Sequence, residues 1–85
     1  KSANILFADA DLDRAVPHAM QVWTFHSGQI CIAGTRLLIE DSIYDEVVSR
    51  LAAAGPKLRI GDPREAGVVV GPVVSAGQRE RIERF

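Results

Sequence analysis

The chain has 85 residues, of which 47% are hydrophobic and 25% charged, and its formal net charge is −1. This near-neutral charge does not indicate a nucleic-acid or membrane surface, and no apolar run is long enough to cross a bilayer, so we expect neither kind of partner. The single cysteine cannot form a disulfide within the chain, which favours a reducing compartment such as the cytoplasm.

The first part of the sequence predicts a strand followed by a helix. The apolar run ANILF, residues 3–7, is typical of a strand buried on both faces of a parallel sheet. Asp9 and Asp11 are good candidates to cap the next helix, and Gly28 is its natural end. Pro17 interrupts the helical pattern and predicts either a kink or a fresh helix start. The apolar residues at helical spacing are Leu12, Ala15, Val16, Ala19, Val22 and Trp23.

A second strand and a second helix are predicted in the middle of the chain. The run RLLIE, residues 36–40, follows a crossover that is long enough for a helix, so the two strands should be parallel. Ser42 and Asp45 have the spacing of a capping box, and Gly55 with Pro56 should end the helix. One face of this helix is apolar and is formed by Ile43, Val47, Val48 and Leu51.

The last part of the chain is predicted to contain one short extended piece and a final polar helix. The extended piece is KLRIGDP, residues 57–63, and the apolar stretch at residues 67–74 turns at its Gly-Pro pair. Ser75 and Gln78 again have capping-box spacing, which indicates a helix start. The apolar side of this helix is formed by Ile82 and Phe85.

The element order is therefore β-α-β-α-β-α, which predicts the α/β class with a parallel sheet. Two principal strands are too few for a complete sheet, and the sequence starts without methionine, directly in strand-like residues. We therefore expect residues 1–85 to be an incomplete segment of a larger domain. Taken alone, such a segment has exposed sheet edges that invite pairing between copies of the chain.

Cys31 is the residue with the clearest potential for chemistry, and it lies in the stretch FHSGQICIAGTR. A lone cysteine in a small α/β domain is usually a packed hydrophobic residue. Gly28 and Gly34 flank it, however, and neither glycine fits the interior of a helix or strand. The preceding helix presents its negative end, which does not stabilise a thiolate. The residues alone leave both interpretations open: a structural cysteine, or a nucleophile activated by groups from elsewhere.

The other candidate residues are explained more simply. His26 has the chemistry to form a dyad with Cys31, but the helix dipole also explains a histidine at a helix C-terminus. His18 has no nearby cysteine or second histidine, and the sequence has no metal-ligand spacing, so we expect no metal site. Neither common glycine-rich phosphate loop is present, so a nucleotide site would have to be completed elsewhere.

Five segments occur in the order and spacing of the NAD(P)-dependent aldehyde dehydrogenase superfamily, and the resemblance covers the whole chain from Lys1 to Phe85. The stretch GQICIAG resembles the catalytic cysteine signature of that family, which is highly specific. Many family members have asparagine where His26 stands, so this position departs from the common pattern. The five segments are KSANILFADADLDRAV, FHSGQICIAGTRLLI, IYDEVVSRL, KLRIGDP and GPVVS.

The resemblance implies roles for three residues. Cys31 would be the nucleophile that attacks the carbonyl of a small aldehyde, and its backbone N–H would contribute to the oxyanion hole. A thiohemiacetal and then a thioester would lead to a carboxylic acid. Gln78 and, more weakly, Arg81 fall where family members contact the ribose side of NAD or NADP.

The resemblance also implies that essential parts lie outside residues 1–85. The general-base glutamate, the oxyanion asparagine and most of the cofactor domain would precede Lys1, and the oligomerisation strands of a homo-oligomer would follow Phe85. We therefore expect a partial catalytic domain that is inactive alone and belongs to a cytoplasmic enzyme. Two alternatives remain open. One is a superfamily member that forms acyl-CoA or reduces an acyl phosphate, and the other is a non-catalytic α/β interaction module with a structural cysteine.

Overall fold

The computed structural model describes residues 2–85, and Lys1, the start of the polar lead into the first strand, lies outside the described part. Two parallel strands form the sheet, β1 (Ala3–Leu6) and β2 (Arg36–Ile39). Their four residue pairs run in continuous register. The predicted parallel pairing is therefore confirmed, and the crossover between the strands carries the first helix as expected.

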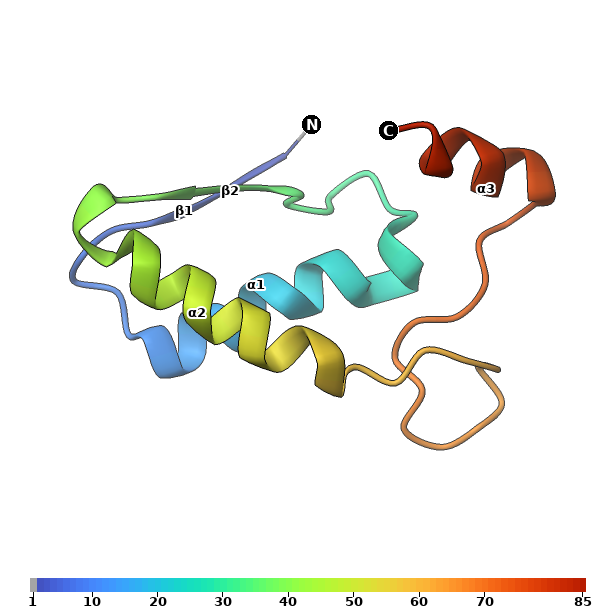
Figure 1. Ribbon diagram of the computed structural model, residues 1–85, viewed down its shortest axis with the longest axis horizontal. Coiled ribbons are helices and arrows are strands. Elements are labelled where there is room, and N and C mark those ends of the chain that lie inside the picture. The colour runs from blue at the N-terminus through green and yellow to red at the C-terminus, as the bar shows by residue number, and fades with distance from the viewer. Residues whose placement is uncertain (1) are drawn as a thin grey trace.

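Three α-helices accompany the sheet, α1 (Leu12–Thr24), α2 (Tyr44–Ala54) and α3 (Ala76–Glu83). In Figure 1, α1 and α2 run side by side along one side of the two strands, and α3 stands apart near the C-terminus. The α/β class is confirmed, with two strands and three helices. The chain also contains three short 3-10 segments, namely η1 (Phe25–Gly28), η2 (Asp41–Ile43) and η3 (Gly55–Lys57).

The helix α1 is continuous through its proline. Asp11 caps its start, because the Asp11 carboxylate accepts a hydrogen bond from the backbone N–H of Asp13 at 3.1 Å. The predicted fresh start at Pro17 does not occur, since Pro17 lies inside a single helix. Its ring is on the exposed side, and its missing N–H removes only one bond of the helix ladder.

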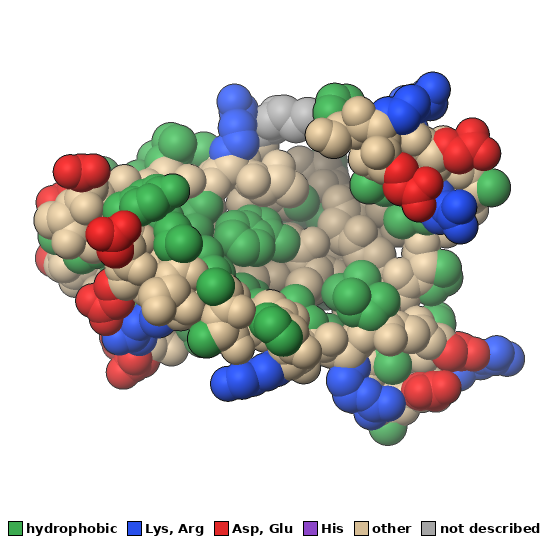
Figure 2. All heavy atoms as spheres, in the orientation of Figure 1, with side chains coloured by type: hydrophobic (Ala, Val, Ile, Leu, Met, Phe, Trp, Pro, Cys, Tyr) green, Lys and Arg blue, Asp and Glu red, His purple; other side chains and the backbone are tan. Residues whose placement is uncertain are grey.

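The core lies where one face of the sheet meets α1 and α2. Leu6, Val16 and Val47 are its buried centre, contributed by β1, α1 and α2 in turn. Removing such side chains from water is the main force that holds the three elements together. Figure 2 shows hydrophobic side chains gathered in the middle of the visible face, with charged side chains mostly around the edges. The half-buried residues packed against the core are Leu12, Ala15, Leu37, Ile39, Ile43 and Leu51.

The other face of the sheet is not covered within this chain. Ile5 and Leu38 are each 54% exposed and Phe7 is 63% exposed, although all three are large and apolar. Only the first strand, residues 3–7, was predicted to be buried on both faces, and this part of the prediction is wrong for the chain taken alone. The physical reason is that only one layer of helices packs on the two strands.

The start of α2 differs from the sequence-based expectation. The predicted capping box of Ser42 and Asp45 does not form, because Ser42 lies in η2 and no side chain caps α2. The Ser42 hydroxyl instead donates to Glu40 at 3.1 Å, and the other oxygen of Glu40 accepts the Ala8 backbone N–H at 2.8 Å. Glu40 thus ties the end of β2 to the chain leaving β1, and this tertiary contact replaces the local cap.

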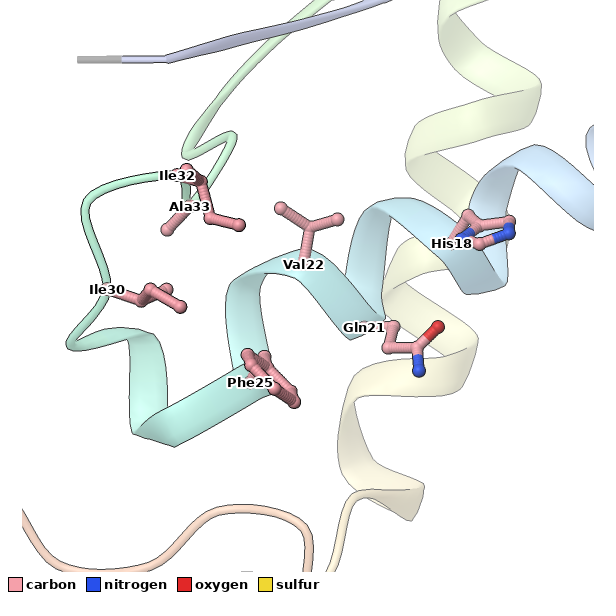
Figure 3. Close-up of a pocket in the computed structure, with 7 residues that line it drawn as sticks. All are labelled: His18, Gln21, Val22, Phe25, Ile30, Ile32 and Ala33. Carbon is pink, nitrogen blue, oxygen red and sulfur yellow. The ribbon is translucent and has the colours of Figure 1, made fainter.

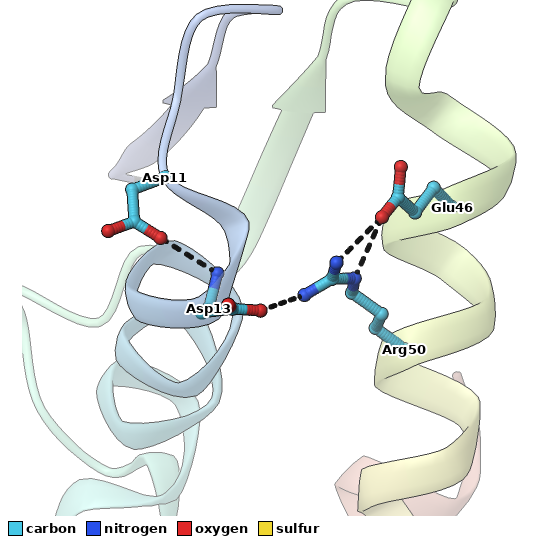
Figure 4. Close-up of polar contacts among 4 residues, drawn as sticks. All are labelled: Asp11, Asp13, Glu46 and Arg50. Carbon is cyan, nitrogen blue, oxygen red and sulfur yellow. Dashed lines mark hydrogen bonds and ion pairs between the residues drawn. The ribbon is translucent and has the colours of Figure 1, made fainter.

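A cluster of charged side chains joins α1 to α2 on the surface (Figure 4). Arg50 contacts Asp13 of α1 at 2.6 Å and Glu46, one turn earlier in α2, at 2.7 Å. The hydrogen bond to Asp13, followed by that to Glu46, raises the pKa of the Arg50 guanidinium above its usual value. Arg50 therefore stays charged, and its ion pair with Asp13 links α2 to α1 at their solvent-facing edge.

The predicted third strand is reduced to one parallel bridge between Ile60 and Val70. The backbone N–H of Gly61 donates to the Val70 carbonyl at 3.1 Å, but the ladder does not extend further. Pro63 follows within the same loop and has no N–H to continue a ladder. The predicted end of α2 before the Gly-Pro pair is confirmed, because the helix gives way to η3 at Gly55.

Candidate active site

A left-handed stretch of backbone reverses the chain after α1 and leads to Cys31. His26 and Ser27 have φ values of 48° and 57°, and Gly28 follows with φ of 73°. This region is uncommon for residues other than glycine. A β-carbon at Gly28 would lie 3.1 Å from the carbonyl oxygen of Trp23, so glycine is also required for space. The helix was predicted to run to Gly28, but α1 already stops at Thr24, because the backbone turns left-handed from His26 onward.

Cys31 lies on a tight turn immediately after this reversal. The backbone N–H of Ala33 donates to the Ile30 carbonyl at 3.2 Å, so Cys31 is one of the two central residues of the turn. The thiol is free and exposed. Within the described residues, no hydrogen bond involves the Cys31 backbone N–H. The interpretation of Cys31 as a packed core residue is therefore not supported within this chain.

The chain leaving the turn is fixed firmly to the fold. The indole N–H of Trp23 donates to the Gly34 carbonyl at 2.7 Å. A β-carbon at Gly34 would lie 3.3 Å from Cβ of Asn4 and 3.5 Å from Cγ1 of Val22. Gly34 therefore permits a close approach of the loop to both β1 and α1. This contact anchors the turn that carries Cys31 on its C-terminal side.

On its N-terminal side, the turn is held by a distant segment of the chain. The Ser27 hydroxyl accepts the backbone N–H of Gly71 at 2.9 Å. The Gln29 side chain accepts the backbone N–H of Val74 at 2.8 Å and donates to the Pro72 carbonyl at 3.4 Å. Ser27 and the distant partners of Gln29 could not be identified from the sequence, because these hydrogen bonds join residues that are 43 to 45 positions apart.

An apolar hollow of about 260 Å³ lies beside the cysteine turn (Figure 3). The two neighbours of Cys31 in sequence, Ile30 and Ile32, both line it. Figure 3 shows their side chains gathered with Val22 and Phe25 around the end of α1. His18, Gln21 and Ala33 complete the lining. The hollow is therefore suited to a hydrocarbon group placed next to the turn.

His26 does not act as a partner of Cys31 in this structure. Its ring meets the ring of Phe25 edge to face, with centroids 4.5 Å apart. No hydrogen bond in the described part of the chain joins the His26 side chain to the cysteine turn. The strained left-handed backbone, rather than the predicted dipole contact, is the feature that distinguishes His26.

The predicted cofactor residues, Gln78 and Arg81, both lie on α3. The backbone N–H of Gln78 donates to the Ser75 hydroxyl at 3.2 Å, so the predicted N-cap is confirmed. Gln78 is half-buried and Arg81 is exposed. Among residues 2–85, no hydrogen bond or ion pair uses either side chain, and none joins them to the cysteine turn. The structure thus leaves both side chains available to a ligand without bringing them into contact with Cys31.

Neither a metal-ligand cluster nor a membrane-spanning helix is present among residues 2–85. No three His, Cys, Asp or Glu side chains between residues 2 and 85 are grouped so that they could hold a metal ion. In the same part of the chain, no helix combines the length and the apolar character that a membrane span requires.

The geometry is that of a small α/β unit that presents a free cysteine on a constrained, exposed turn, and comparison with known proteins identifies its family. The model of the "Aldehyde dehydrogenase family" matches residues 1–85. The betaine aldehyde dehydrogenase of Bacillus subtilis (strain 168) is 40% identical over 85 residues, which are 100% of this chain and 17% of that protein. The protein named "Aldehyde dehydrogenase, cytosolic 1" from Rattus norvegicus is 48% identical over 82 residues, or 96% of this chain and 16% of that protein.

The solved structures agree with the sequence comparison. The betaine aldehyde dehydrogenase of Staphylococcus aureus, in complex with NAD+, matches with a TM-score of 0.95 and 38% identity, covering 98% of this chain and 16% of that one. The chain therefore belongs to the aldehyde dehydrogenase family, which confirms the resemblance seen in the sequence. It spans about 16–17% of the length of these relatives.

Proposed function

We propose that this chain is the nucleophile-bearing segment of the catalytic domain of an NAD(P)-dependent aldehyde dehydrogenase, with Cys31 as the nucleophile. The observation that carries the proposal is the position of Cys31, free and exposed on a turn that is fixed on both sides. A structure of the related Staphylococcus aureus enzyme is described with NAD+ and a BME-modified cysteine, which supports a reactive thiol in the family.

The chemistry follows from covalent catalysis by a thiolate. The sulfur attacks the aldehyde carbonyl carbon, a C–S bond forms, and the π electron pair moves to the oxygen. The Cys31 backbone N–H has no protein acceptor among the described residues, so it is available to donate to this oxyanion. Loss of hydride from the same carbon gives a thioester, and water then cleaves the C–S bond to give the carboxylic acid and the thiol, which loses a proton to regenerate the thiolate.

The cofactor would be held partly by α3. Gln78 offers an unused side-chain amide and Arg81 an unused guanidinium, and both groups donate hydrogen bonds to hydroxyl oxygens such as those of a ribose. When bound, the nicotinamide supplies the acceptor for the hydride. The residues present therefore fit one part of a cofactor site, and the remainder would come from other parts of the longer enzyme.

We infer that apolar groups fill the hollow beside the turn, because Ile30, Ile32 and Phe25 line it and Cys31 does not. The longer protein is expected to be a homo-oligomer. We also expect it in the cytosol, because the name of its rat relative describes that protein as cytosolic. Cell fractionation and gel filtration of the longer protein test these two expectations.

The central test uses the full-length protein that carries this segment. Cys31→Ala should lower kcat for NAD+- or NADP+-dependent aldehyde oxidation by roughly a thousandfold or more, because no other group can form the thioester. The full-length variant Ser49→Ala, on the exposed side of α2, is the matched control and should keep its activity. Activity in Cys31→Ala equal to that of the control would exclude Cys31 as the nucleophile.

Two further measurements separate this function from its alternatives. Product analysis with and without coenzyme A distinguishes carboxylic acid formation from acyl-CoA formation, and acyl phosphate reduction is assayed in the reverse direction. A non-catalytic module would instead show no turnover with any of these substrates. The 85-residue chain alone should show no oxidation above its Cys31→Ala variant, because the family's general base and most of its cofactor domain are expected outside it.

A further inference from the structure

We propose that Ser27 and Gln29 form a clamp that positions Cys31 by holding its turn against residues 71–74, which lead directly into α3. Both side chains are positioning residues, since neither is placed on the reacting atoms. The proposal deepens the proposed function and rests on it for the catalytic consequence. The position of the thiol itself, however, is measurable without catalysis.

The clamp consists of three hydrogen bonds from two side chains to one backbone segment. Gln29 uses both ends of its amide, since Oε1 accepts from Val74 N at 2.8 Å and Nε2 donates to the Pro72 carbonyl at 3.4 Å. Ser27 adds the bond from Gly71 N to its Oγ at 2.9 Å, and this bond is partly buried. The Gln29 amide thus pairs with the backbone N–H of Val74 and with the backbone carbonyl of Pro72, two residues earlier. A residue of a neighbouring β-strand would form the same pair of hydrogen bonds with this segment.

The backbone next to Cys31 needs such support. His26 and Ser27 are both left-handed, which costs about 1–2 kcal/mol for each residue that is not glycine. Such a conformation persists only where surrounding contacts determine it. Gln29 also donates to the His26 carbonyl at 3.3 Å, so the same side chain bridges the reversal and the distant segment. Cys31 lies two residues after Gln29, and its position therefore depends on these bonds.

The clamp also connects the nucleophile to the helix expected to hold the cofactor. The clamped segment ends at Val74, and the next residue, Ser75, is the N-cap of α3. In Figure 1, α3 stands apart from the body formed by the sheet, α1 and α2. The backbone of residues 71–74 is therefore the point at which α3, with Gln78 and Arg81, is fixed relative to Cys31.

The test compares four variants of the full-length protein that carries this segment. Gln29→Met has a similar length but removes both amide bonds to residues 71–74, together with the bond to the His26 carbonyl. Gln29→Glu keeps the acceptor for Val74 while losing the donor to Pro72 and His26. Ser27→Ala removes the third bond, and the double variant Ser27→Ala with Gln29→Met removes all three. Ser49→Ala on α2 is again the control for a serine that is not part of the clamp.

The first readout is the rate at which iodoacetamide labels Cys31, measured from pH 6 to 10. At pH 7, Gln29→Met and Ser27→Ala should label at least about threefold more slowly than the wild type, because the displaced turn moves the thiol away from the activating base that, on the proposed function, other parts of the longer enzyme supply. Near pH 9.5, where an ordinary thiol is ionised, the rates should converge. Gln29→Glu should lie between Gln29→Met and the wild type. General loosening of the fold would give the opposite result, faster labelling at every pH.

The second readout is kcat per titrated thiol. Each single variant should lose about tenfold, in line with the known sensitivity of catalysis to small misplacement. If the two effects were independent, the double variant would lose roughly a hundredfold in kcat. We expect a much smaller loss, because both side chains act through the same contact with residues 71–74. A merely structural role would lower the amount of folded enzyme and leave kcat per thiol unchanged.

The outcomes separate this inference from the proposed function. If the Ser27 and Gln29 variants showed the same dependence of labelling rate on pH as Ser49→Ala, the inference of a clamp would be overturned. This holds even if Cys31→Ala abolishes activity. Faster labelling of the variants at every pH would also overturn it. If Cys31→Ala kept full activity, the nucleophile assignment would fail, yet slower labelling at pH 7 with convergence near pH 9.5 would still establish that Ser27 and Gln29 position the thiol.

Discussion

Three successive residues in the left-handed region, His26, Ser27 and Gly28, form the reversal that precedes Cys31. Only Gly28 was recognised from the sequence as a special position, and its role there was to end a helix. The two neighbouring residues carry side chains that are strained in this conformation, and hydrogen bonds across the fold compensate for the strain. At the scale of the residue, the conformation of this turn therefore depends more on its hydrogen bonds than on its amino-acid types.

Gly28→Ala is the sharpest test of this reversal. The new β-carbon would lie 3.1 Å from the Trp23 carbonyl oxygen and would sit at a φ of 73°. We expect a loss of about 1–2 kcal/mol in the free energy of unfolding from the backbone conformation alone, and more from the contact. Urea denaturation of the full-length protein measures the change.

A second glycine provides the matched control for that substitution. Gly77 lies inside α3, and a β-carbon there meets no atom within 4 Å. Gly77→Ala should therefore stabilise the helix by about 0.5–1 kcal/mol. If Gly28→Ala were as stable as Gly77→Ala, the left-handed reversal would not be a requirement of the fold.

At the scale of the element, helix caps were predicted correctly from adjacent residues where no tertiary contact competed with the cap. Asp11 and Ser75 cap their helices as their positions predict. Ser42 does not, because it lies inside η2 and the N-cap position of α2 is Ile43. Pro17 was expected to break or kink a helix, yet the amphipathic face around it is buried against the sheet and α2, and this packing keeps α1 in one piece.

The Arg50 cluster makes a testable contribution to the packing of α1 on α2. Arg50→Met keeps much of the side-chain length but removes the contacts to Asp13 and Glu46. We expect a lower melting temperature at low salt, and a smaller difference from the wild type at 1 M salt, because exposed charges are screened. Differential scanning calorimetry of the full-length protein measures both.

An exposed arginine on α1 serves as the control for that change. Arg14 is an exposed residue of α1, and no ion pair among residues 2–85 uses its side chain. Arg14→Met should leave the melting temperature nearly unchanged at both salt concentrations. Equal behaviour of Arg14→Met and Arg50→Met would show that the cluster does not hold the two helices together.

At the scale of the whole molecule, the chain is one layer of helices on two strands, and the opposite face of the sheet is open. This open face carries three large apolar side chains that are more than half exposed, Ile5, Phe7 and Leu38. A contiguous exposed apolar surface is unusual on a monomeric soluble protein. The chain spans only 16–17% of the length of its relatives. We infer that other parts of a longer enzyme cover this face and complete the sheet.

Studied alone, the 85-residue chain should therefore associate with itself. Sedimentation velocity should show larger species as concentration rises, because apolar strand surface and unpaired strand edges are both available. Ile5→Lys together with Leu38→Lys should shift the distribution toward the monomer. Val48→Lys, which changes an exposed residue of α2, is the control and should have little effect. A monomer at every concentration would contradict this prediction.

The sequence by itself determined the α/β class, the parallel strands, the apolar face of α1 and the family, because each depends on local periodicity or on a motif of adjacent residues. It also singled out Cys31, although the residues alone could not separate a packed thiol from an exposed one. Only the tertiary structure decided that Cys31 is exposed and that Ser27 and Gln29 hold its turn. The physical reason is distance along the chain: these hydrogen bonds join backbone groups 43 to 45 residues away, where no local pattern records them.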